Sequence, residues 1–264
     1  MEKTIAVIAS LVLFTAWESL RPYYAFSKGH TLRIVANAAI GLSNVVLGRL
    51  LFSAVYAWLL AFTQTGNYGL LNVLFGFYVV KLIAAILLLD LWSYWWHRFN
   101  HTIPFLWRFH RAHHTDTEMC AVSAYRFHPV EILLSSILRM PLIFLLGVPV
   151  EALLLYEVIL AVSTAFHHAN LGVGARLDSL LRLVIVSPIM HKLHHSTKAA
   201  EFSSNYSSIL SVWDRIFKTW TVSAQPEAIT LGLSIYRHPW WQGYIGILLT
   251  PFRGSNYANS RRGG

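Results

Sequence analysis

Histidine is concentrated in one part of this sequence. Eleven of the 13 histidines in the 264-residue chain lie between positions 97 and 195, most of them in short groups. Residues three and four apart lie above one another on a helix, so a group with the spacing H-x-x-H-H presents its imidazoles as a fork. Two such triads occur: His110, His113 and His114, and His191, His194 and His195. Because imidazole is a common ligand of transition metals, the triads predict bound metal rather than packed core residues.

The number of candidate donors predicts more than one ion. A pair of histidines four residues apart and an isolated histidine after an apolar stretch add to the two triads. The predicted ligands are His97, His101, His110, His113, His114, His168, His191, His194 and His195. Nine donors are too many for one ion and suit two six-coordinate ions with about three positions left open. A structural zinc site closes itself with four ligands, whereas oxygen or water activation needs open positions, so the donor number favours catalysis.

Two further histidines are candidates either for ligation or for hydrogen bonds to a ligand. His167 and His168 are adjacent, so on a helix their side chains diverge by about 100° and both reach one cluster only with difficulty. His128 precedes a proline and suits a supporting role as well as it suits ligation. His30 and His238 stand apart from the groups, and we interpret both as ordinary interface residues.

Ligating histidines usually donate their second ring nitrogen to a carboxylate or a carbonyl, and few carboxylates are available here. Asp90 precedes His97 by two helical turns, so we expect it on the side of the helix that faces the metal, supporting the ligands. The alternative is a structural ion pair between Asp90 and Arg49. Asp214 and Glu131 are further candidates for hydrogen bonds to the ligands.

The composition indicates a membrane protein. The chain is 55% hydrophobic and only 12% charged, which is unlike an ordinary soluble domain. One membrane crossing needs roughly 20 apolar residues. Apolar stretches of about this length or longer occupy residues 4–20, 34–63, 69–96 and 132–168. The last is long enough for a hairpin with its turn at Gly147-Val148-Pro149-Val150, because proline cannot continue a helix.

We therefore expect an all-α integral membrane bundle of about four transmembrane helices or hairpin equivalents, with a histidine-rich helical cap. No linker rich in Gly, Pro or Ser divides the chain, so residues 1–264 are predicted to form one domain with a disordered tail at 251–264. Arg49 and Lys81 fall inside apolar stretches. Each marks either the end of a shorter helix or a side chain that extends to the far interface.

The basic residues predict the orientation of the cap. The net charge is +9, but the cations are dispersed and no nucleic-acid motif accompanies them, so nucleic acid is not an expected partner. Cations flank the histidine groups, whereas the candidate turns 64–68 and 147–150 carry no charge. The positive-inside rule then places the cap on the cytoplasmic side. A basic face around Arg108, Arg111 and Lys192 is expected to dock an acidic electron donor.

Several motifs follow one another in an order that resembles a known family. They are D-x-x-x-Y-W-x-H-R-x-x-H from Asp90, H-R-x-H-H from His110, R-F-H-P-x-E from Arg126, H-A-N from His168, S-P-x-M-H-K-x-H-H from Ser187, and N-Y followed by W-D-R-I-F between Asn205 and Phe217. Over about residues 85–220 the chain resembles the fatty acid hydroxylase and sterol desaturase superfamily of membrane di-iron oxygenases. The extra His167 before the H-A-N motif departs from the family pattern.

The resemblance implies a membrane enzyme that binds two irons through the nine histidines and uses O2 to hydroxylate or desaturate a lipid C–H bond. The lipid would be a sterol, a fatty acyl chain, a carotenoid or an ether lipid, and zinc can replace iron during purification. The chain shows no fused cytochrome b5-like domain, so a separate cytochrome b5, ferredoxin or reductase is expected to supply electrons. The alternative class is a non-enzymatic membrane protein that binds metal or haem, such as a transporter or cytochrome.

Overall fold

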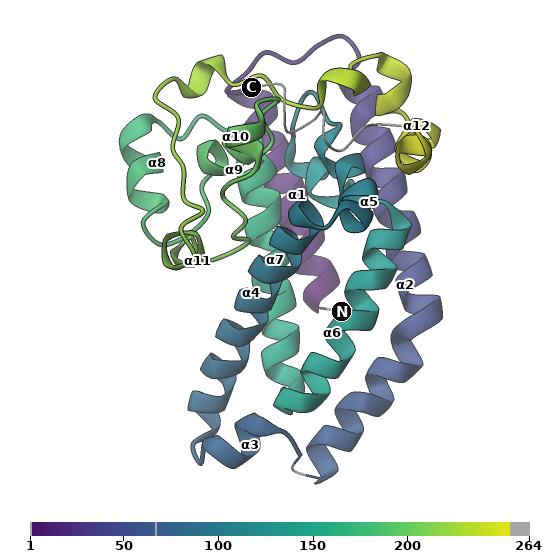
Figure 1. The fold of residues 1–264 in the computed structure, drawn as a ribbon, viewed down its shortest axis with the longest axis vertical. Coiled ribbons are helices and arrows are strands. Elements are labelled where there is room, and N and C mark those ends of the chain that lie inside the picture. Colours follow the sequence, from purple (N-terminus) through teal and green to yellow (C-terminus); the bar gives the residue numbers. More distant parts are fainter. Residues whose placement is uncertain (1, 67, 254–264) are drawn as a thin grey trace.

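The chain is described here by a computed structural model that covers residues 2–66 and 68–253. Within these ranges the regular elements are helices, and three isolated β-bridges link loops. The predicted all-α class is confirmed. Figure 1 shows long helices standing side by side, with short helices and loops gathered at one end, which we call the cap.

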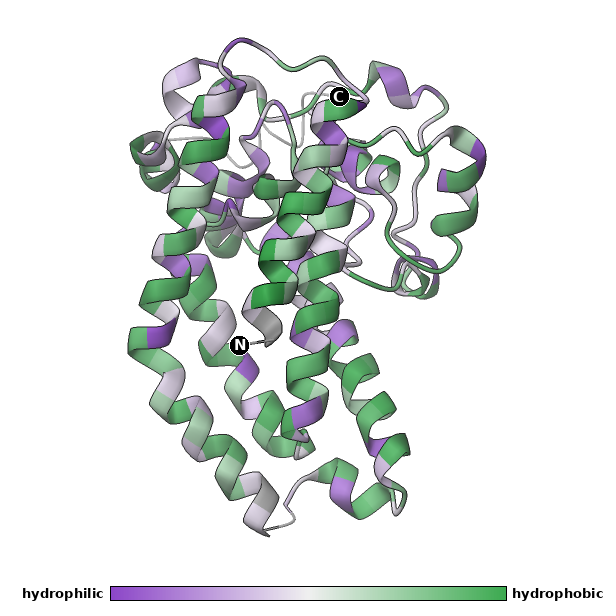
Figure 2. Ribbon diagram, turned by 180° about the vertical axis from the view of Figure 1, so that it is seen from behind, coloured by the Kyte–Doolittle hydropathy of each residue, from purple (hydrophilic) through white to green (hydrophobic). Residues whose placement is uncertain are grey.

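Five long helices form the bundle. They are α1 (Glu2–Leu20), α2 (His30–Gly66), α4 (Tyr78–Thr102), α6 (Pro129–Leu146) and α7 (Val150–His168). Of these, α2, α4, α6 and α7 are long and apolar enough to cross a membrane, whereas the apolar part of α1, Thr4–Leu20, is shorter. Figure 2 shows that the bundle away from the cap is mostly hydrophobic and that hydrophilic residues gather in the cap. The predicted count of about four transmembrane helices is confirmed, and by length and composition the chain is an integral membrane protein.

Short elements make up the cap. They are α5 (Pro104–His114), η1 (Ala121–Tyr125), α8 (Ala175–Leu181), α9 (Pro188–His194), α10 (Ala199–Phe202), α11 (Val212–Ile216), η2 (Pro226–Ala228), η3 (Ser234–Tyr236), η4 (Pro239–Gln242), α12 (Tyr244–Leu249) and η5 (Thr250–Phe252). Most of them lie between α7 and the C-terminal end. The cap is therefore built mainly from the second half of the chain (Figure 1).

The far end of the bundle is a pair of packed turns. The predicted hairpin at 132–168 is confirmed, because α6 ends at Gly147 in the left-handed conformation (φ 66°) and α7 begins three residues later. The apolar stretch 69–96 does not form one helix. A short helix, α3 (Leu70–Leu74), precedes extended residues around Gly76, and α4 then runs from Tyr78 to Thr102. Glycine disfavours a helix interior, which accounts for the break.

The two cations inside apolar stretches have different environments. Lys81 lies in the first turn of α4, and its ammonium group donates to Asn72 Oδ1 at the far end of the bundle (3.1 Å). Lys81 therefore extends toward the far interface. Arg49 is exposed in the middle of α2, which continues to Gly66, so the interpretation that Arg49 ends a shorter helix is wrong.

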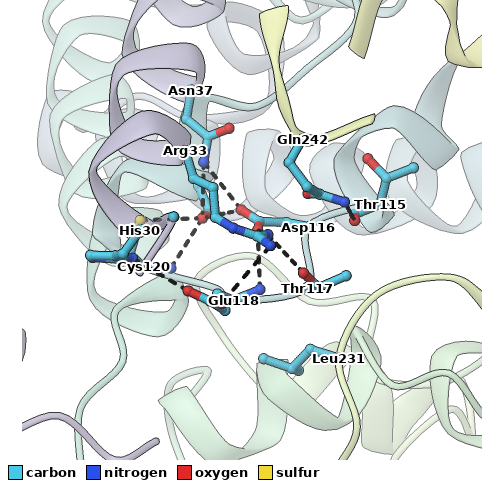
Figure 3. Close-up of polar contacts among 12 residues, drawn as sticks. His30, Arg33, Asn37, Thr115, Asp116, Thr117, Glu118, Cys120, Leu231 and Gln242 are labelled. Atoms are coloured by element: carbon cyan, nitrogen blue, oxygen red, sulfur yellow. Dashed lines mark hydrogen bonds and ion pairs between the residues drawn. The ribbon is translucent and has the colours of Figure 1, made fainter. Parts of the chain in front are cut away.

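A polar cluster attaches α2 to the loop that follows α5, as Figure 3 shows. Arg33 donates to Thr117 Oγ1 (2.7 Å), and Asn37 donates to Asp116 Oδ2 (3.1 Å). Ser123 of η1 donates to the same carboxylate oxygen (2.6 Å). Charge-assisted hydrogen bonds between buried groups are strong, so the loop between the cap elements α5 and η1 is fixed to a membrane helix.

The predicted disordered tail at 251–264 begins too early. Pro251 and Phe252 belong to η5, and the carbonyl of Pro251 accepts a hydrogen bond from Arg108 Nε (2.6 Å). Arg111 likewise donates to the carbonyl of Arg253 (2.7 Å). These bonds to α5 hold the start of the predicted tail in place. Residues 254–264 lie outside the described residues.

The turn at Gly147 provides a test of the fold. A methyl group added at Gly147 would lie 2.0 Å from the carbonyl oxygen of Tyr68, on backbone that already has positive φ. We expect Gly147→Ala to lower the free energy of unfolding by about 2 kcal/mol or more. Thermal unfolding in detergent measures the change.

The control is Gly48→Ala, in the interior of α2, where an added methyl group meets no atom within 4 Å. This substitution is expected to be neutral or to stabilise the protein by up to about 1 kcal/mol. Equal melting temperatures for the two variants would contradict the role assigned to the turn.

Candidate metal centre

The structure gathers the nine predicted ligands into two neighbouring groups. The first histidine group is His97, His101, His110, His114 and His194, and the second histidine group is His113, His168, His191 and His195. In each group, one ring nitrogen per residue lies within 4.8 Å of all the others. Each H-x-x-H-H triad contributes to both groups. His110 and His114 lie in the first group and His113 in the second, whereas His191 and His195 lie in the second group and His194 in the first. The two triads therefore interlock instead of holding one ion each.

Helix boundaries place these side chains. The helix α4 ends one residue after His101, and Ile103 adopts an extended conformation before Pro104 begins α5. The first residue of a helix needs no N–H for the helical hydrogen bonds, so proline suits this position and α5 starts at Pro104. The helix α9 begins in the same way at Pro188, with Ser187 Oγ accepting from the amide of Met190 (3.2 Å). Two short helices thus present the triads toward the ends of α4 and α7.

The spacing between imidazoles fits ligands that share an ion. Within the groups the Nε2–Nε2 distances are 3.1 Å for His101–His110, His113–His168 and His168–His191, and 3.2 Å for His110–His114 and His191–His195. For a metal–nitrogen bond of about 2.1 Å, adjacent ligands are ~3.0 Å apart in an octahedron and ~3.4 Å apart in a tetrahedron. The observed Nε2–Nε2 distances are closer to the octahedral value.

The opposite nitrogen of five rings is anchored. Nδ1 faces the carbonyl of Tyr206 in His97 (2.8 Å), of Ser204 in His194 (2.6 Å), of Thr164 in His168 (2.8 Å) and of Arg126 in His113 (3.2 Å), and it faces Glu131 Oε1 in His110 (2.8 Å). A carbonyl or carboxylate partner requires the proton on Nδ1, which leaves the Nε2 lone pair free for a metal. The Nε2 atoms of His97 and His194 are buried without a hydrogen-bond partner among the described residues. These orphaned acceptors fit a metal ligand.

Burial keeps the rings neutral. Desolvation lowers the pKa of His113, His114, His191 and His195 well below the usual histidine value, and their neighbouring imidazoles lower it further. Desolvation likewise lowers the pKa of His194 to about 3. At neutral pH these imidazoles carry no charge, which is the form that binds a metal ion.

Of the predicted carboxylates, Glu131 is the one that the structure places against a ligand. Besides His110, it accepts from Asn100 Nδ2 (3.2 Å). Asp90 instead accepts from the indole N–H of Trp213 (2.8 Å) and from the amide of Leu210 (3.1 Å). The alternative ion pair between Asp90 and Arg49 is wrong, because Asp90 is buried against the cap and Arg49 is exposed on α2.

Asp214 supports a ligand indirectly. Its two oxygens accept from the amides of Tyr206 (2.8 Å) and Ser207 (3.0 Å), and Thr219 Oγ1 also donates to it (2.7 Å). Tyr206 is the residue whose carbonyl faces His97 Nδ1. Asp214 therefore fixes the loop that orients His97 without touching the imidazole.

The remaining histidines lie outside the two groups. The ring of His167 is tilted against that of His191, with centroids 4.1 Å apart, but His167 is not among the convergent donors. His128 caps α6 by accepting from the amide of Val130 (3.1 Å). His30 stacks on Phe26, and His238 caps η4.

Two of the three cations in the predicted basic docking face are buried, so the prediction is wrong for Arg111 and Lys192, whereas Arg108 is exposed. Lys192 is fully buried, and its ammonium group donates to the carbonyl of Ala169 (2.8 Å), next to His168. Arg111 is also buried and donates to the carbonyl of Thr250 (2.8 Å). Desolvation lowers the pKa of Lys192 to about 7 although the coulombic effect of Glu18 opposes it. These cations stabilise the interior of the cap and are not available to a partner.

Sequence reasoning missed Glu18. This residue is fully buried at the end of α1, and its carboxylate accepts from the amides of Asn170 (2.8 Å) and Ala121 (3.0 Å). Asn170 follows His168 by two residues. The signal in the sequence was an acid near the end of an otherwise apolar stretch, which is costly to bury unless it is hydrogen-bonded. Glu18 thus ties α1 to the segment that carries a candidate ligand.

Glu131→Gln tests the carboxylate partner of His110. Replacing a charged acceptor with an amide weakens the bond that fixes the tautomer of the ring, so we expect about a 10-fold loss of metal affinity in the first histidine group. Metal retention against a graded chelator, measured by elemental analysis, reports the change. Glu151→Gln is the control, because Glu151 lies on the far end of α7 and bonds to Tyr78. Equal retention in both variants would count against the assignment.

Lys192→Met tests the buried lysine. Loss of the bond to the Ala169 carbonyl leaves a buried acceptor unpaired, at a cost of about 1.5–3 kcal/mol, next to a ligand of the second histidine group. We expect the metal content to fall from two ions per chain toward one, with the first group still loaded. Lys198→Met is the control, because Lys198 is exposed and pairs with Glu201 on the surface (3.2 Å). Two bound ions in Lys192→Met would show that the lysine does not position the second group.

Comparison with known proteins agrees with this geometry. The fatty acid hydroxylase family model matches residues 82–219. The ornithine lipid hydroxylase OlsE of Rhizobium tropici is 26% identical over 172 residues, which are 65% of this chain and 50% of that protein. Alkylglycerol monooxygenase of Homo sapiens is 29% identical over 161 residues, 59% of this chain and 33% of that protein. Sphinganine C4-monooxygenase 1 of Arabidopsis thaliana is 26% identical over 234 residues, 83% of this chain and 88% of that protein.

The extent of these matches differs among the relatives. The aligned part spans half of the length of the ornithine lipid hydroxylase and a third of that of alkylglycerol monooxygenase. No solved structure matches the chain. The family model covers more than half of the chain and includes both histidine groups. The chain belongs to the fatty acid hydroxylase family.

Proposed function

We propose that this protein is a membrane-bound non-haem di-iron oxygenase that uses O2 and two external electrons to hydroxylate a C–H bond of a lipid. The observation that carries the proposal is the pair of adjacent histidine groups, with five and four convergent imidazoles. Two neighbouring sites of this kind, with about three coordination positions left over for O2 or water, suit oxygen activation better than a closed structural site. Iron is the metal that supplies this redox chemistry.

In this proposal the first histidine group holds one iron and the second group holds the other, and the pair supplies the activation of O2. Burial keeps imidazoles such as those of His113, His114, His191 and His195 neutral, and hydrogen bonds to carbonyls and to Glu131 fix the Nδ1 proton of five rings. Ligands are thereby oriented before the metal arrives, so little reorganisation is needed on binding. The buried surroundings also limit the access of water to the site.

The names of the relatives support a lipid substrate. They describe a hydroxylase of ornithine lipid and monooxygenases of alkylglycerol and sphinganine. Each of these names denotes insertion of oxygen, so we favour hydroxylation over desaturation. A lipid substrate also agrees with four helices long and apolar enough to span a membrane, because the substrate would reach the site from the bilayer.

We propose that the cap lies on the cytoplasmic side. Exposed cations at the cap include Arg21, Lys28, Arg176, Lys198 and Lys218, in agreement with the positive-inside rule. A separate protein, such as cytochrome b5, a ferredoxin or a reductase, would then deliver electrons there. It cannot use the face around Arg111 and Lys192, since both side chains are buried.

The geometry does not favour the haem alternative. A bis-histidine haem needs two opposed imidazoles with the porphyrin between them, whereas neighbouring Nε2 atoms here are 3.1–3.2 Å apart within crowded groups. A transporter would place its ligands near the middle of the membrane. The histidine groups instead lie where α4, α5, α7 and α9 meet, at the cap end of the bundle (Figure 1).

Removing one ligand from each group tests the proposed activity. We expect His113→Ala combined with His194→Ala to abolish the oxygenated lipid while the protein remains in the membrane, because neither ion keeps its full ligand set. Mass spectrometry of lipids from cells that express the parent, the double variant or neither protein identifies the product. His238→Ala, outside both groups, is the control and should retain the product. Turnover in the double variant would contradict the proposal.

The metal content provides a separate test. Protein purified from iron-supplemented cells is expected to hold two metal ions per chain and to show no Soret absorption band. Zinc in place of iron would leave the site geometry supported, because imidazole sites bind zinc readily during overexpression. A Soret band, or one ion per chain in the parent protein, would overturn the di-iron assignment.

A further inference from the structure

Two cap elements expose aliphatic side chains beside the membrane helices. We call residues 174–186 and 209–220 together the α8–α11 unit. Its exposed aliphatic residues are Leu177, Leu180, Leu183, Val184, Val212 and Ile216, of which Leu180, Leu183, Val184 and Ile216 are more than half exposed. Several exposed aliphatic side chains on neighbouring segments of a polar cap indicate a surface that is covered in the functional protein.

The two segments of the unit are hydrogen-bonded to each other. The amide of Val186 donates to the carbonyl of Ile209 (3.0 Å), and the amide of Ser211 donates to the carbonyl of Val184 (3.1 Å). The guanidinium of Arg215 also donates to the carbonyl of Leu183 (2.8 Å). The exposed aliphatic residues therefore belong to one local structure and not to two independent loops.

Asp90 fixes the height of this unit along the bundle. It lies 12 residues from each end of α4 (Tyr78–Thr102), which corresponds to about 18 Å along the helix axis. Its carboxylate accepts from Trp213 Nε1 and from the amide of Leu210 in the unit. The hydrocarbon core is about 30 Å thick, so a helix that enters it near Tyr78 still lies within it at Asp90. In Figure 1, α11 accordingly lies at the lower edge of the cap, beside α4.

The charges of the unit suit an anionic surface. Arg176 and Lys218 are exposed next to the aliphatic residues. The two acids of the unit, Asp178 and Asp214, are both buried, and Asp178 faces the guanidinium of Arg182 (3.6 Å). The exposed charge of the unit is therefore positive. Long cationic side chains beside an apolar face extend toward lipid headgroups while the apolar atoms remain in the hydrocarbon.

We propose that the α8–α11 unit is an interfacial element that inserts its aliphatic face into the leaflet on the cap side and binds anionic headgroups through Arg176 and Lys218. The occupant of the patch is the same bilayer that the long helices span. Two observations select it: the hydrogen bonds to Asp90, which place the unit against the middle of a membrane helix, and the positive exposed charge of the unit, which complements anionic headgroups.

The unit also connects the leaflet to the metal centre. Asp214 of α11 holds the amides of Tyr206 and Ser207, and the carbonyl of Tyr206 faces His97 Nδ1. Insertion of the unit would therefore set the level of the first histidine group relative to the lipid surface. The proposal goes beyond the oxygenase activity and does not depend on which metal is bound.

Site-directed labelling in vesicles tests the insertion. One cysteine is added at a time, as Leu180→Cys or Ile216→Cys, and is labelled with an environment-sensitive fluorophore; the native Cys120 is buried and should take up no label. Vesicles contain phosphatidylcholine and phosphatidylglycerol with brominated acyl chains as the membrane quencher, and iodide serves as the aqueous quencher. Glu227→Cys, exposed on η2, is the control position.

We expect brominated lipid to quench the labels at positions 180 and 216 about threefold more strongly than the label at position 227, with iodide showing the opposite order. The variants should retain the metal content of the parent, since both positions are on the surface. Labels at 180 and 216 that iodide reaches as well as it reaches 227, or that neither quencher reaches, would overturn the proposal.

A second comparison tests the headgroup interaction. Adding phosphatidylglycerol to phosphatidylcholine vesicles is expected to increase brominated-lipid quenching at position 216 about twofold, and Arg176→Gln with Lys218→Gln should remove this increase. Lys28→Gln, an exposed cation elsewhere on the cap, should leave it intact. If phosphatidylglycerol has no effect on the unsubstituted unit, or if Lys28→Gln removes the effect equally, the assignment of Arg176 and Lys218 to anionic headgroups is wrong.

Discussion

Nine imidazoles lie together in this protein, eight of them buried and His97 partly buried, with their Nε2 atoms directed at one another. The Nδ1 atoms of His113 and His168 both face carbonyls, so their Nε2 lone pairs, 3.1 Å apart, repel each other unless a cation lies between them. Such an arrangement is stable only if metal ions occupy the space between the rings or if the surrounding structure holds the rings in place. Much of the cap serves the second purpose.

That support comes mainly from the backbone. Carbonyls of Tyr206, Ser204, Thr164 and Arg126 face the Nδ1 atoms of four ligands. Two of these carbonyls lie on segments that buried polar groups fix, and for Tyr206 the group is Asp214. The guanidinium of Arg126, fully buried, donates to Asn37 Oδ1, to the carbonyl of Ala112 and to Thr115 Oγ1, so its own carbonyl is held in a rigid position opposite His113. Orientation of the rings thus depends on residues that do not ligate.

The membrane helices outside the family match take part in the same support. Glu18 of α1 holds the amides of Asn170 and Ala121, and Arg33 and Asn37 of α2 hold the loop that follows the first triad. A buried carboxylate is stabilised when several amides donate to it. The helices α1 and α2 therefore also hold the segments that carry the candidate ligands in place.

The class of the fold and the candidate ligands could be predicted from the amino-acid sequence. Its apolar stretches are long enough for membrane helices, and histidines three and four apart share a helix face, so both follow from local periodicity. The sequence could not show that His113 and His194 each lie in a different histidine group from the other members of their triads. That arrangement depends on how α5 and α9 pack against each other. Nor could the sequence show that Lys192 points inward or that Asp90 binds Trp213 rather than Arg49, since the partners are far apart in the chain. Burial and long-range hydrogen bonds decide these positions, and only the packing of α1, α4, α7 and the cap supplies them.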